Sequence, residues 1–527
     1  MEIVKTDILV IGGGGAGMQA ALAAREEGAE VLLVSKTPIG KSTCTYLSGG
    51  AFSLAVEGAS REDQVKRTLH VGKGINERKL VEALVEDAPE RVRNLERLGL
   101  VGEYQKGRFN CLGKPPSWGA PLTDVLAKAV VQQGISVHPW VVIFEILKEK
   151  DRVAGAFGFD FHKGKPVAFL SKGAILANGG GAALYCRHDN PVRITGDGYA
   201  LALHAGCRLR DMEFVQFIPV GLAEPGKPTQ LIAPLLADFA KIINSKGEDV
   251  LAKYQITDRP AATQSRDLFS LAMILEEKAG REVFIDVRSL SEDDWPKDNM
   301  SRSQRSLILQ SFGGSRKPLR ISPMCHFFMG GVAAGENGGT EVPGLFAAGE
   351  VMGGLHGANR MGGNALAEIL VFGYRAGRAA AEWAKGQSLR KVADSSLERS
   401  WASKTGSAIG DTPKLLRKRI GEVLWNEGGI LRDGPGLAGA LNALQKLSKE
   451  DLPRLKAANP KEMMERLEVQ NALLVGEMIV RSALMREESR GAHFRRDFPQ
   501  TDDRNWKGNI FLKKAGEEMD LELRPLA

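Results

Sequence analysis

The sequence predicts an α/β fold that is followed, beyond about residue 385, by a helical region. Three patterns support this prediction. A strand, a glycine-rich turn, a helix and a second strand open the chain; several later strands end in glycine or acid; and apolar residues recur at helical spacing beyond residue 412. The chain has 527 residues, of which 43% are hydrophobic and 26% charged, which is typical of a globular protein with roughly three to four packed units.

The N-terminal segment "TDILVIGGGGAGMQAALAAREEGAEVLLVSK" predicts strands at residues 8–11 and 31–34 around an alanine-rich helix. Gly12, Gly14 and Gly17 have the spacing G-x-G-x-x-G. In that pattern the glycines make a tight turn, let the backbone approach a pyrophosphate and let the helix pack on the strand. The free N–H groups at the helix start then face the phosphates. We therefore predict a Rossmann-like dinucleotide-binding domain, the alternative being a chance glycine loop.

The end of the second strand departs from a plain NAD-binding pattern. An acid normally binds the ribose there, whereas this chain has Ser35 and Lys36. Later segments also end at glycine or acid: "ILANGG" at 175–180, the turn before a helix at Asp197, and "VPGLFAAGE", which ends at Glu350. Such strand ends are expected where one long cofactor lies across the carboxyl edge of a sheet.

Charge and cysteine content exclude several classes of protein. The net charge of +7 is spread along the chain, and "KLLRKR" at 414–419 is better explained as a solvated helix face than as a nucleic-acid site. The five cysteines are far apart without a C-x-x-C pair, so we expect no iron–sulfur or other metal site within the chain. The uncharged run at 8–24 is too glycine-rich for a signal peptide. We expect a cytoplasmic chain that reaches a membrane's inner face only through a partner.

Five motifs, in order, resemble the flavoprotein subunit family of succinate dehydrogenase and fumarate reductase, which includes L-aspartate oxidase and the adenylylsulfate reductase flavoprotein. They are the βαβ unit, "TGDG…DMEFVQF", "HFFMGG", "GLHGANRMGGNALAE" and "MREESRGAHFRRDFPQTDD". The resemblance covers nearly the whole chain and implies FAD as the cofactor. It also implies four parts: an FAD-binding domain at 1–218 and 325–385, an α+β capping domain at 219–324, a helical domain at 386–490 and a C-terminal tail at 491–527.

By this resemblance, "GANRMGGNALAE" passes beneath the isoalloxazine ring, where a side chain larger than alanine's would collide with the flavin. Gly362 and Gly363 keep that approach clear. Asn364 begins a helix whose positive end stabilises electron density on the reduced ring. The implied FAD-binding residues are Gly12, Gly14, Gly15, Ala16, Gly17, Ser35, Lys36, Thr37, Ser42, Thr43, Gly49, Gly50, Ala177, Asn178, Gly179, Asp197, Glu350, Gly363, Asn364, Ala365 and Leu366.

Three basic side chains have catalytic roles by the same resemblance: Arg360 clamps a substrate carboxylate, His326 binds it, and Arg266 shuttles a proton. The implied enzyme is an FAD-dependent oxidoreductase that acts on CH–CH bonds. A guanidinium fork suits a carboxylate, but an arginine is ordinarily too basic to release a proton, so the last role rests on the family. The residues alone leave other interpretations open: Arg360 paired with Glu350, His326 satisfied in a core, or Arg266 paired with Asp267.

The first departure from the family concerns attachment of the flavin. Members with covalent FAD have a histidine within "RSHT", whereas this chain has "KSTC" and places Thr43 at the linkage position. Threonine cannot form that bond, so we expect noncovalent FAD, as in L-aspartate oxidase. A thioether to Cys44 is the alternative.

The second departure concerns the substrate. In "FIPVGL", Ile218 replaces a carboxylate-binding histidine of the succinate, fumarate and aspartate enzymes, and Ile232 and Ala233 stand where a threonine and a glutamate are expected. A second carboxylate would be buried without partners there, at a cost of several kcal/mol. We expect Arg266, His326 and Arg360 to bind a single carboxylate or a similar anion.

The C-terminal half predicts two long helices. Thr412 caps one that opens with Pro413, and Asn459 and Pro460 begin another, whose apolar stripe is better explained by core packing than by a cofactor. The tail resembles that of members with an iron–sulfur partner, but also that of L-aspartate oxidase. We therefore predict a subunit that passes electrons between an iron–sulfur partner and a carboxylate-bearing substrate other than a standard dicarboxylate. The alternatives are a self-contained oxidase similar to L-aspartate oxidase, and a flavin-binding scaffold without turnover.

Overall fold

The computed structural model describes residues 2–113, 118–404, 410–516 and 518–526, in which the largest element is a seven-stranded sheet. Its strands are β1 (Glu2–Ile11), β2 (Val31–Val34), β6 (Ser136–His138), β7 (Val141–Glu149), β8 (Arg152–Asp160), β9 (Lys165–Leu176) and β16 (Leu345–Ala347). β2 and β9 flank β1 in parallel, so that the ends of all three strands lie at one edge. Both predicted N-terminal strands are present, although β1 begins six residues earlier than expected.

Two long helices pack closely against each other next to this sheet. They are α1 (Gly15–Glu26), which follows the glycine turn, and α11 (Asn364–Lys385), which begins at the predicted residue. A Cβ atom at Gly377 would lie 2.3 Å from the carbonyl oxygen of Ala20, so glycine is required at this crossing. The surrounding elements are α2 (Cys44–Leu47), β3 (Ala51–Ser53), α3 (Arg61–Val71), α4 (Arg78–Arg97), β4 (Gly102–Gln105), β5 (Arg108–Cys111), α5 (Gly119–Gln132), α6 (Asp197–Ala205) and α12 (Asp394–Lys404).

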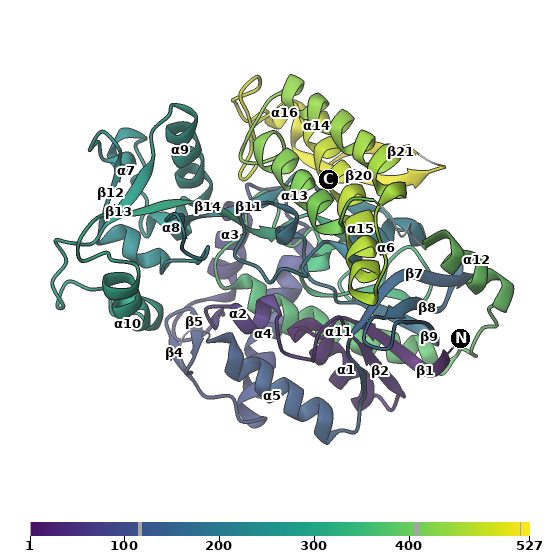
Figure 1. Cartoon of the computed structure of the whole chain (residues 1–527). Helices are drawn as coiled ribbons and strands as arrows, with labels where there is room; N and C mark the ends of the chain where they lie inside the picture. The colour runs from purple at the N-terminus through teal and green to yellow at the C-terminus, as the bar shows by residue number, and fades with distance from the viewer. Residues whose placement is uncertain (1, 114–117, 405–409, 517, 527) are drawn as a thin grey trace.

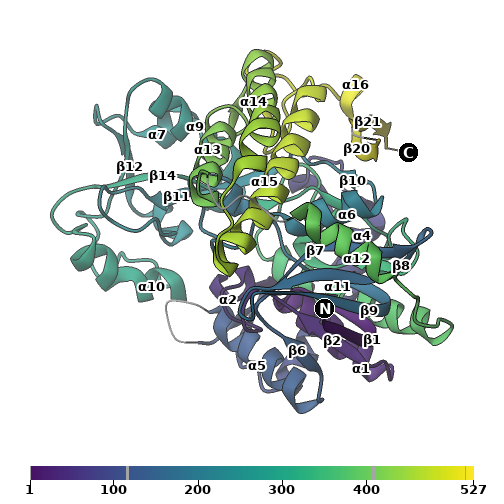
Figure 2. The ribbon, with the colours of Figure 1, turned by 45° about the vertical axis from the view of Figure 1, so that its right-hand side comes forward.

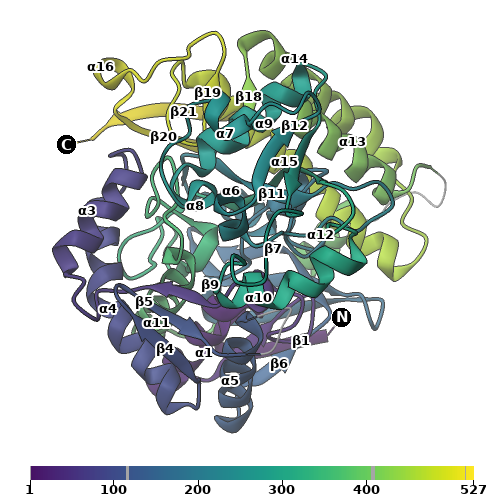
Figure 3. The same cartoon turned by 90° about the vertical axis from the view of Figure 1, so that its left-hand side faces the viewer.

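A capping lobe extends from one side of the molecule (Figure 1) and faces the viewer in Figure 3. Its own hydrophobic core consists of residues between Val220 and Ile321. An antiparallel sheet crosses the lobe in the order β11 (Val215–Leu222), β14 (Leu319–Phe328), β13 (Val283–Asp286) and β12 (Lys241–Asn244). The helices of the lobe are α7 (Val250–Lys253), α8 (Ala261–Gln264), α9 (Arg266–Lys278) and α10 (Asn299–Ser306).

Three helices stand side by side above the main sheet in Figure 2: α13 (Pro413–Asn426), α14 (Gly434–Lys446) and α15 (Pro460–Met485). The predicted caps are present, because Thr412 accepts a hydrogen bond from the Leu415 N–H and Asn459 accepts one from the Glu462 N–H. The segment expected to be a tail instead contains a hairpin. β20 (Gly508–Ala515) and β21 (Glu518–Pro525) pair antiparallel and extend a sheet with β10 (Leu209–Arg210), β15 (Gly331–Ala333) and β17 (Met352–Gly353).

The remaining short elements are β18 (Leu431–Arg432), β19 (Phe494–Arg495) and α16 (Asp503–Trp506). None of the helices within the described part of the chain is long and apolar enough to cross a lipid bilayer.

A buried ionic cluster joins the C-terminal segment to the main body. The Nε atom of Arg486 lies 2.6 Å from Oε1 of Glu213, and its Nη1 atom lies 2.9 Å from Oε1 of Glu488. All three side chains are fully buried, and Arg486 also donates to the Gly508 carbonyl of β20. Burial raises the pKa of Glu213 to about 7 although Arg486 opposes the rise, so this carboxylate depends on its arginine partner.

We expect the substitution Arg486→Met to lower the free energy of unfolding by about 3–5 kcal/mol, because Glu213 would remain buried without its counter-charge. The matched control is Arg496→Met, which removes an exposed arginine paired with Asp433 and should cost at most about 1 kcal/mol. Thermal melting of the FAD-loaded chain measures both changes. Equal shifts in melting temperature would contradict a structural role for the buried cluster.

Candidate active site

A cavity of about 660 Å³ lies where the ends of the parallel strands meet the capping lobe. Its lining includes the three predicted catalytic residues and all of the predicted FAD-binding residues except Gly17 and Asn364. Gly17 does not line the cavity but allows α1 to pack against the glycine turn, since a Cβ atom there would lie 1.8 Å from the Gly12 carbonyl oxygen. Asn364 is fully buried at the start of α11 and donates to Thr68 Oγ1. Both residues therefore support the backbone of the site from outside the cavity.

The glycines of the cavity serve different purposes. A Cβ atom at Gly49 or Gly362 would meet no other atom within 4 Å, so these positions leave the cavity open beside a bare backbone. Gly363 is different, because its φ is +90° and a Cβ atom would lie 2.8 Å from the Ser53 nitrogen. The open space at Gly362 is compatible with the expected approach of the flavin, while Gly363 is required by its own backbone conformation.

The glycine turn and the start of α1 suit the phosphates of a dinucleotide, but one of the N–H groups expected to be free is already bonded. The Gly15 N–H already donates to Thr45 Oγ1 at 3.2 Å, so it is not free as the sequence pattern suggested. Gly12 has a φ of +127° and lies against the Ala177 carbonyl, which brings the ends of β1 and β9 together. The bare backbone and the helix N-terminus make this part of the cavity suitable for FAD.

Lys36 lines the cavity but its ammonium group is already paired. Its Nζ atom lies 2.6 Å from Oδ2 of Asp197 and 2.8 Å from Oε1 of Glu468. Burial alone would lower the pKa of Lys36, but the two carboxylates raise it. This arrangement connects the end of β2 to α6 and to α15, so Lys36 holds the wall of the cavity in place.

Arg266 is the first residue of α9 and is 5% exposed. Its Nη1 atom donates to Gln216 Oε1 at 2.8 Å and its Nε atom donates to the Ala262 carbonyl. In the described structure it forms no ion pair with Asp267. Burial, with the positive charge of Arg360 adding to it, lowers the pKa of Arg266 to about 9. The side chain can therefore exchange a proton far more readily than an exposed arginine.

Arg360 is 6% exposed, and its guanidinium lies 4.4 Å from the centre of the Phe327 ring. None of the described carboxylates forms an ion pair with it, and its Nε atom has no hydrogen-bond partner among the described residues. Glu350, the partner considered from the sequence, instead accepts the Phe328 N–H, and burial raises the pKa of Glu350 to about 8. The charge of Arg360 is therefore available to a ligand.

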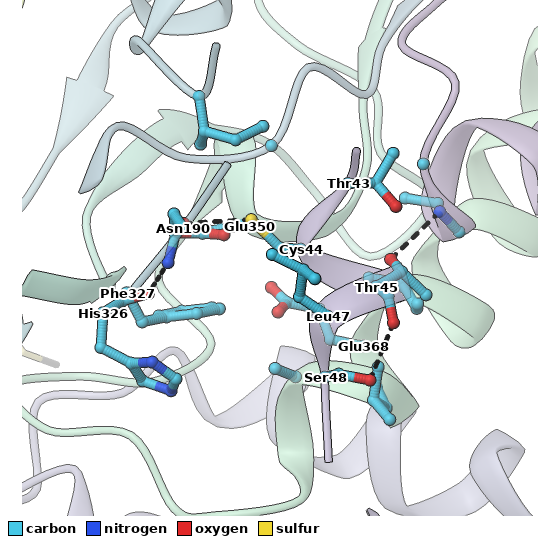
Figure 4. Close-up of a pocket in the computed structure, with 18 of the residues that line it drawn as sticks. Thr43, Cys44, Thr45, Leu47, Ser48, Asn190, His326, Phe327, Glu350 and Glu368 are labelled. Atoms are coloured by element: carbon cyan, nitrogen blue, oxygen red, sulfur yellow. Dashed lines mark hydrogen bonds between the residues drawn. The ribbon is translucent and has the colours of Figure 1, made fainter. Parts of the chain in front are cut away.

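His326 is held by a carboxylate that motif analysis missed. Its Nδ1 atom lies 2.7 Å from Oδ2 of Asp189, whose side chain is 9% exposed. Asn190 donates to the other Asp189 oxygen and to the His326 carbonyl, as Figure 4 shows in part. Burial lowers the pKa of His326; Asp189 opposes this effect, while Arg360 and Arg266 add to it. The imidazole is thus oriented by Asp189 at the edge of the cavity, with 24% of its side chain exposed.

Gln216 is a second residue that the motif analysis did not single out. Its Oε1 atom accepts from Arg266, while its Nε2 atom donates to Asn359 Oδ1 and to the Arg360 carbonyl. One buried amide thus fixes the two arginines relative to each other. The signals in the sequence were modest: the amide lies within the quoted "DMEFVQF", and Asp189 and Asn190 lie in a polar run just before "TGDG".

The residues near the expected flavin linkage do not favour a covalent bond. Thr43 Oγ1 accepts from the Tyr46 N–H and caps α2. The Cys44 thiol donates to Asn190 Oδ1 at 3.0 Å, and burial raises the pKa of Cys44 well above its usual value. Both side chains lie beside the cavity in Figure 4. Cys44 is thus kept as a protonated thiol, which is a poor nucleophile.

The capping lobe contributes hydrocarbon to the cavity. We call the following residues the apolar wall: Ile218, Leu231, Pro234, Leu235 and Met300. Ile232 and Ala233, expected from the sequence to face the substrate, instead pack in the core of the lobe, and the Ala233 N–H donates to Gln304. The apolar lining that we expected at Ile232 and Ala233 is thus contributed by Leu231 and Pro234, the residues on either side of that pair.

Comparisons with known proteins agree with this geometry. A family model described as "FAD binding domain" matches residues 7–366, and one described as "Fumarate reductase flavoprotein C-term" matches residues 417–527. A fumarate reductase (CoM/CoB) subunit from Methanothermobacter marburgensis is 34% identical, with 98% of each chain covered. L-aspartate oxidase from Nostoc sp. is 28% identical over 96% of this chain and 93% of its own.

Among solved structures, an E. coli quinol fumarate reductase FrdA variant superposes with a TM-score of 0.89 at 25% identity, covering 100% of this chain and 97% of that one. The chain therefore belongs to the family of fumarate reductase and succinate dehydrogenase flavoproteins, which are FAD-dependent oxidoreductases that act on CH–CH bonds.

Proposed function

We propose that the chain is the flavoprotein subunit of an enzyme that passes electrons between an iron–sulfur partner and a carboxylate-bearing acid. That acid is not a standard dicarboxylate. One observation carries the proposal: Arg266, His326 and Arg360 line the same cavity as the glycine turn, whereas the capping lobe lines it with the apolar wall. The match of residues 417–527 to fumarate reductase flavoproteins supports an electron-transfer partner.

The substrate carboxylate is bound by Arg360 and by His326. The guanidinium of Arg360 has no competing ion pair among the described carboxylates and can form two parallel hydrogen bonds to a carboxylate. Asp189 holds the Nδ1 atom of His326, so the Nε2 atom is the one left for the ligand. A protonated imidazole donates from Nε2, which polarises the acid as negative charge develops on it.

Arg266 is the residue suited to proton transfer. When bound, FAD supplies or accepts a hydride, so reduction of a C=C bond forms one C–H bond from that hydride and one from a proton held elsewhere. The Arg266 guanidinium, with a pKa lowered to about 9, holds that proton, and Gln216 fixes its direction. The apolar wall keeps water from the reacting carbons.

A self-contained oxidase similar to L-aspartate oxidase is the alternative. Noncovalent FAD favours it, and the C-terminal motif occurs in both kinds of protein, whereas the apolar wall does not suit an amino dicarboxylate. Steady formation of peroxide by the isolated chain, at a rate that matches substrate turnover, would support the oxidase. A bound flavin that no acid or enoate could reduce or reoxidise would instead support a scaffold.

We expect FAD to be released when the purified chain is denatured in acid, because Thr43 cannot form the linkage and Cys44 is held as a thiol. The measurement is the flavin absorbance of the supernatant and of the precipitated protein. Colour that stays with the precipitate would contradict noncovalent attachment.

We expect Arg266→Gln to slow reoxidation of the reduced flavin by a panel of 2-enoates by roughly 10²–10⁴-fold, with normal FAD content. Glutamine keeps a hydrogen-bonding group but cannot supply the proton. In the unsubstituted enzyme the reductive rate should fall as pH rises through about 9, because Arg266 must be protonated to act as the donor. The control is Arg288→Gln, an exposed residue of the capping lobe paired with Asp286. Unchanged rates in Arg266→Gln would remove this residue from the reaction.

We expect Asp189→Asn to shift the pH dependence of carboxylate binding. His326 must be protonated to donate from Nε2, so binding weakens as pH rises through its pKa, and Asp189 raises that pKa. Without this charge the transition should move to lower pH. Titration of an unreactive saturated acid at several pH values measures the shift, with Asp124→Asn on the exposed face of α5 as control. An unmoved transition would make Asp189 a structural residue only.

A further inference from the structure

We propose that the substrate is a monocarboxylate: a 2-enoate, or the corresponding saturated acid, whose β-carbon carries a hydrocarbon group. The inference rests on the proposed function, because it names the class of acid that the same cavity accepts. It follows from where the charged and the apolar groups lie around the cavity.

The cationic groups that a carboxylate could contact gather on one side of the capping lobe interface. Arg266 leads into α9 immediately after α8, and His326 lies on β14 beside β11, which carries Gln216. Gln216 accepts a hydrogen bond from the Arg266 side chain and donates to the Arg360 carbonyl, which connects these two residues, and His326 lies on the strand that pairs with β11. Asp189, 2.7 Å from His326, already places one negative charge beside these groups. This arrangement suits a single carboxylate rather than two separated ones.

The rest of the surface that the capping lobe contributes is mainly hydrocarbon. The apolar wall is made by β11, by the segment at 231–235 and by α10. Burial of a methylene group against such a surface tightens binding roughly fourfold, whereas an unpaired carboxylate there would lose its hydration without compensation. The apolar wall therefore favours an alkyl or aryl group over a second anion.

The carboxylate of Asp298 also favours a hydrocarbon group over a second anion on the substrate. Asp298 lines the cavity next to Met300 and caps α10 by accepting the Ser301 N–H. Among the described residues of the capping lobe that line the cavity, Asp298 is the only carboxylate, and it lies in the part that carries the apolar wall rather than beside Arg266 and His326 in the sequence. A second carboxylate of the substrate would meet this like charge beside hydrocarbon, and both effects oppose its binding.

Arg108 is the residue through which a dicarboxylate could still bind. It lies on β5, lines the cavity and has an exposed side chain. Solvent screens the exposed part of this side chain, but burial and the nearby charge of Arg67 lower the pKa of Arg108, so its guanidinium is partly desolvated and could contact a second carboxylate. We therefore include it in the test as the rival explanation.

The test measures equilibrium binding of saturated acids to the oxidised, FAD-loaded full chain by titration calorimetry, without turnover. We expect propionate, butyrate and pentanoate to bind roughly three- to fourfold more tightly with each added methylene. Butyrate should bind at least about tenfold more tightly than succinate, which differs from it by one carboxylate in place of a methyl group. Tighter binding of succinate, or equal affinity along the series, would overturn the inference while leaving the proposed function intact. If no acid binds at all, the proposed function itself fails.

Two variants sharpen the result. Ile218→His introduces a hydrogen-bonding cation into the apolar wall and should reduce the preference for butyrate over succinate by about tenfold, whereas Leu415→His on the exposed face of α13 should leave it unchanged. In Arg108→Gln we expect the preference for butyrate to persist. A loss of succinate affinity confined to Arg108→Gln would assign a second carboxylate to Arg108 and contradict the monocarboxylate. If Ile218→His fails to retain FAD, the affinities of the unsubstituted chain for propionate, butyrate, pentanoate and succinate still test the inference.

Discussion

The close approach of backbone to backbone at the glycine turn is the constraint on which the site depends. A Cβ atom at Gly12 would lie 2.1 Å from the Ala177 carbonyl oxygen, and one at Gly17 would lie 1.8 Å from that of Gly12. These contacts hold the ends of β1 and β9 and the start of α1 at one edge of the sheet. The helix α11 packs closely against α1, because Gly377 allows its backbone to approach the Ala20 carbonyl. This packing places the segment before Asn364 at the same edge of the sheet. The cavity is therefore bordered by backbone, and its chemistry comes from side chains supplied by other elements.

Two of those side chains, Arg266 and Arg360, are buried without an ion pair among the described residues. Removing Arg266 and Arg360 from water is unfavourable, and the pKa of each is lowered, with burial as the largest cause. The protein compensates in part with the hydrogen bond that Arg266 donates to the neutral amide of Gln216 and with the Asp189 carboxylate next to His326. An incoming carboxylate completes the compensation, which explains why a site with this charge arrangement binds an anion and why Arg266 is able to give up a proton.

The sequence predicted most of the fold because the signals were local. A strand, a glycine turn and a helix are specified by neighbouring residues, and the helices that begin at Pro413 and Pro460 follow from capping by Thr412 and Asn459. The start of α11 at Asn364 was expected from the resemblance, since Gly363 before it makes no side-chain capping bond. The resemblance supplied residues for the site whose positions around one cavity agree with the structure. Asp189 and Gln216 were missed because their role depends on partners distant in sequence: 137 residues separate Asp189 from His326 and 50 separate Gln216 from Arg266. The C-terminal hairpin was missed because β20 is completed by pairing with β10, which no local pattern reveals.

The sheet of the capping lobe is also part of the active site. β14 begins at Leu319 and Ile321 in the core of the lobe and reaches His326 at the cavity, while β11 carries Gln216 and Ile218 before it enters the same core. The pairing of Phe217 with Cys325 places the anion-binding residues and the apolar wall on adjacent strands. Because Gln216 also donates to the Arg360 carbonyl, the cavity end of this sheet is joined to the segment that carries Arg360. The apolar end of the acid would contact Ile218 on the same strand as Gln216, while its carboxylate would contact His326 on the neighbouring strand, so the binding of the two ends is coupled through one sheet.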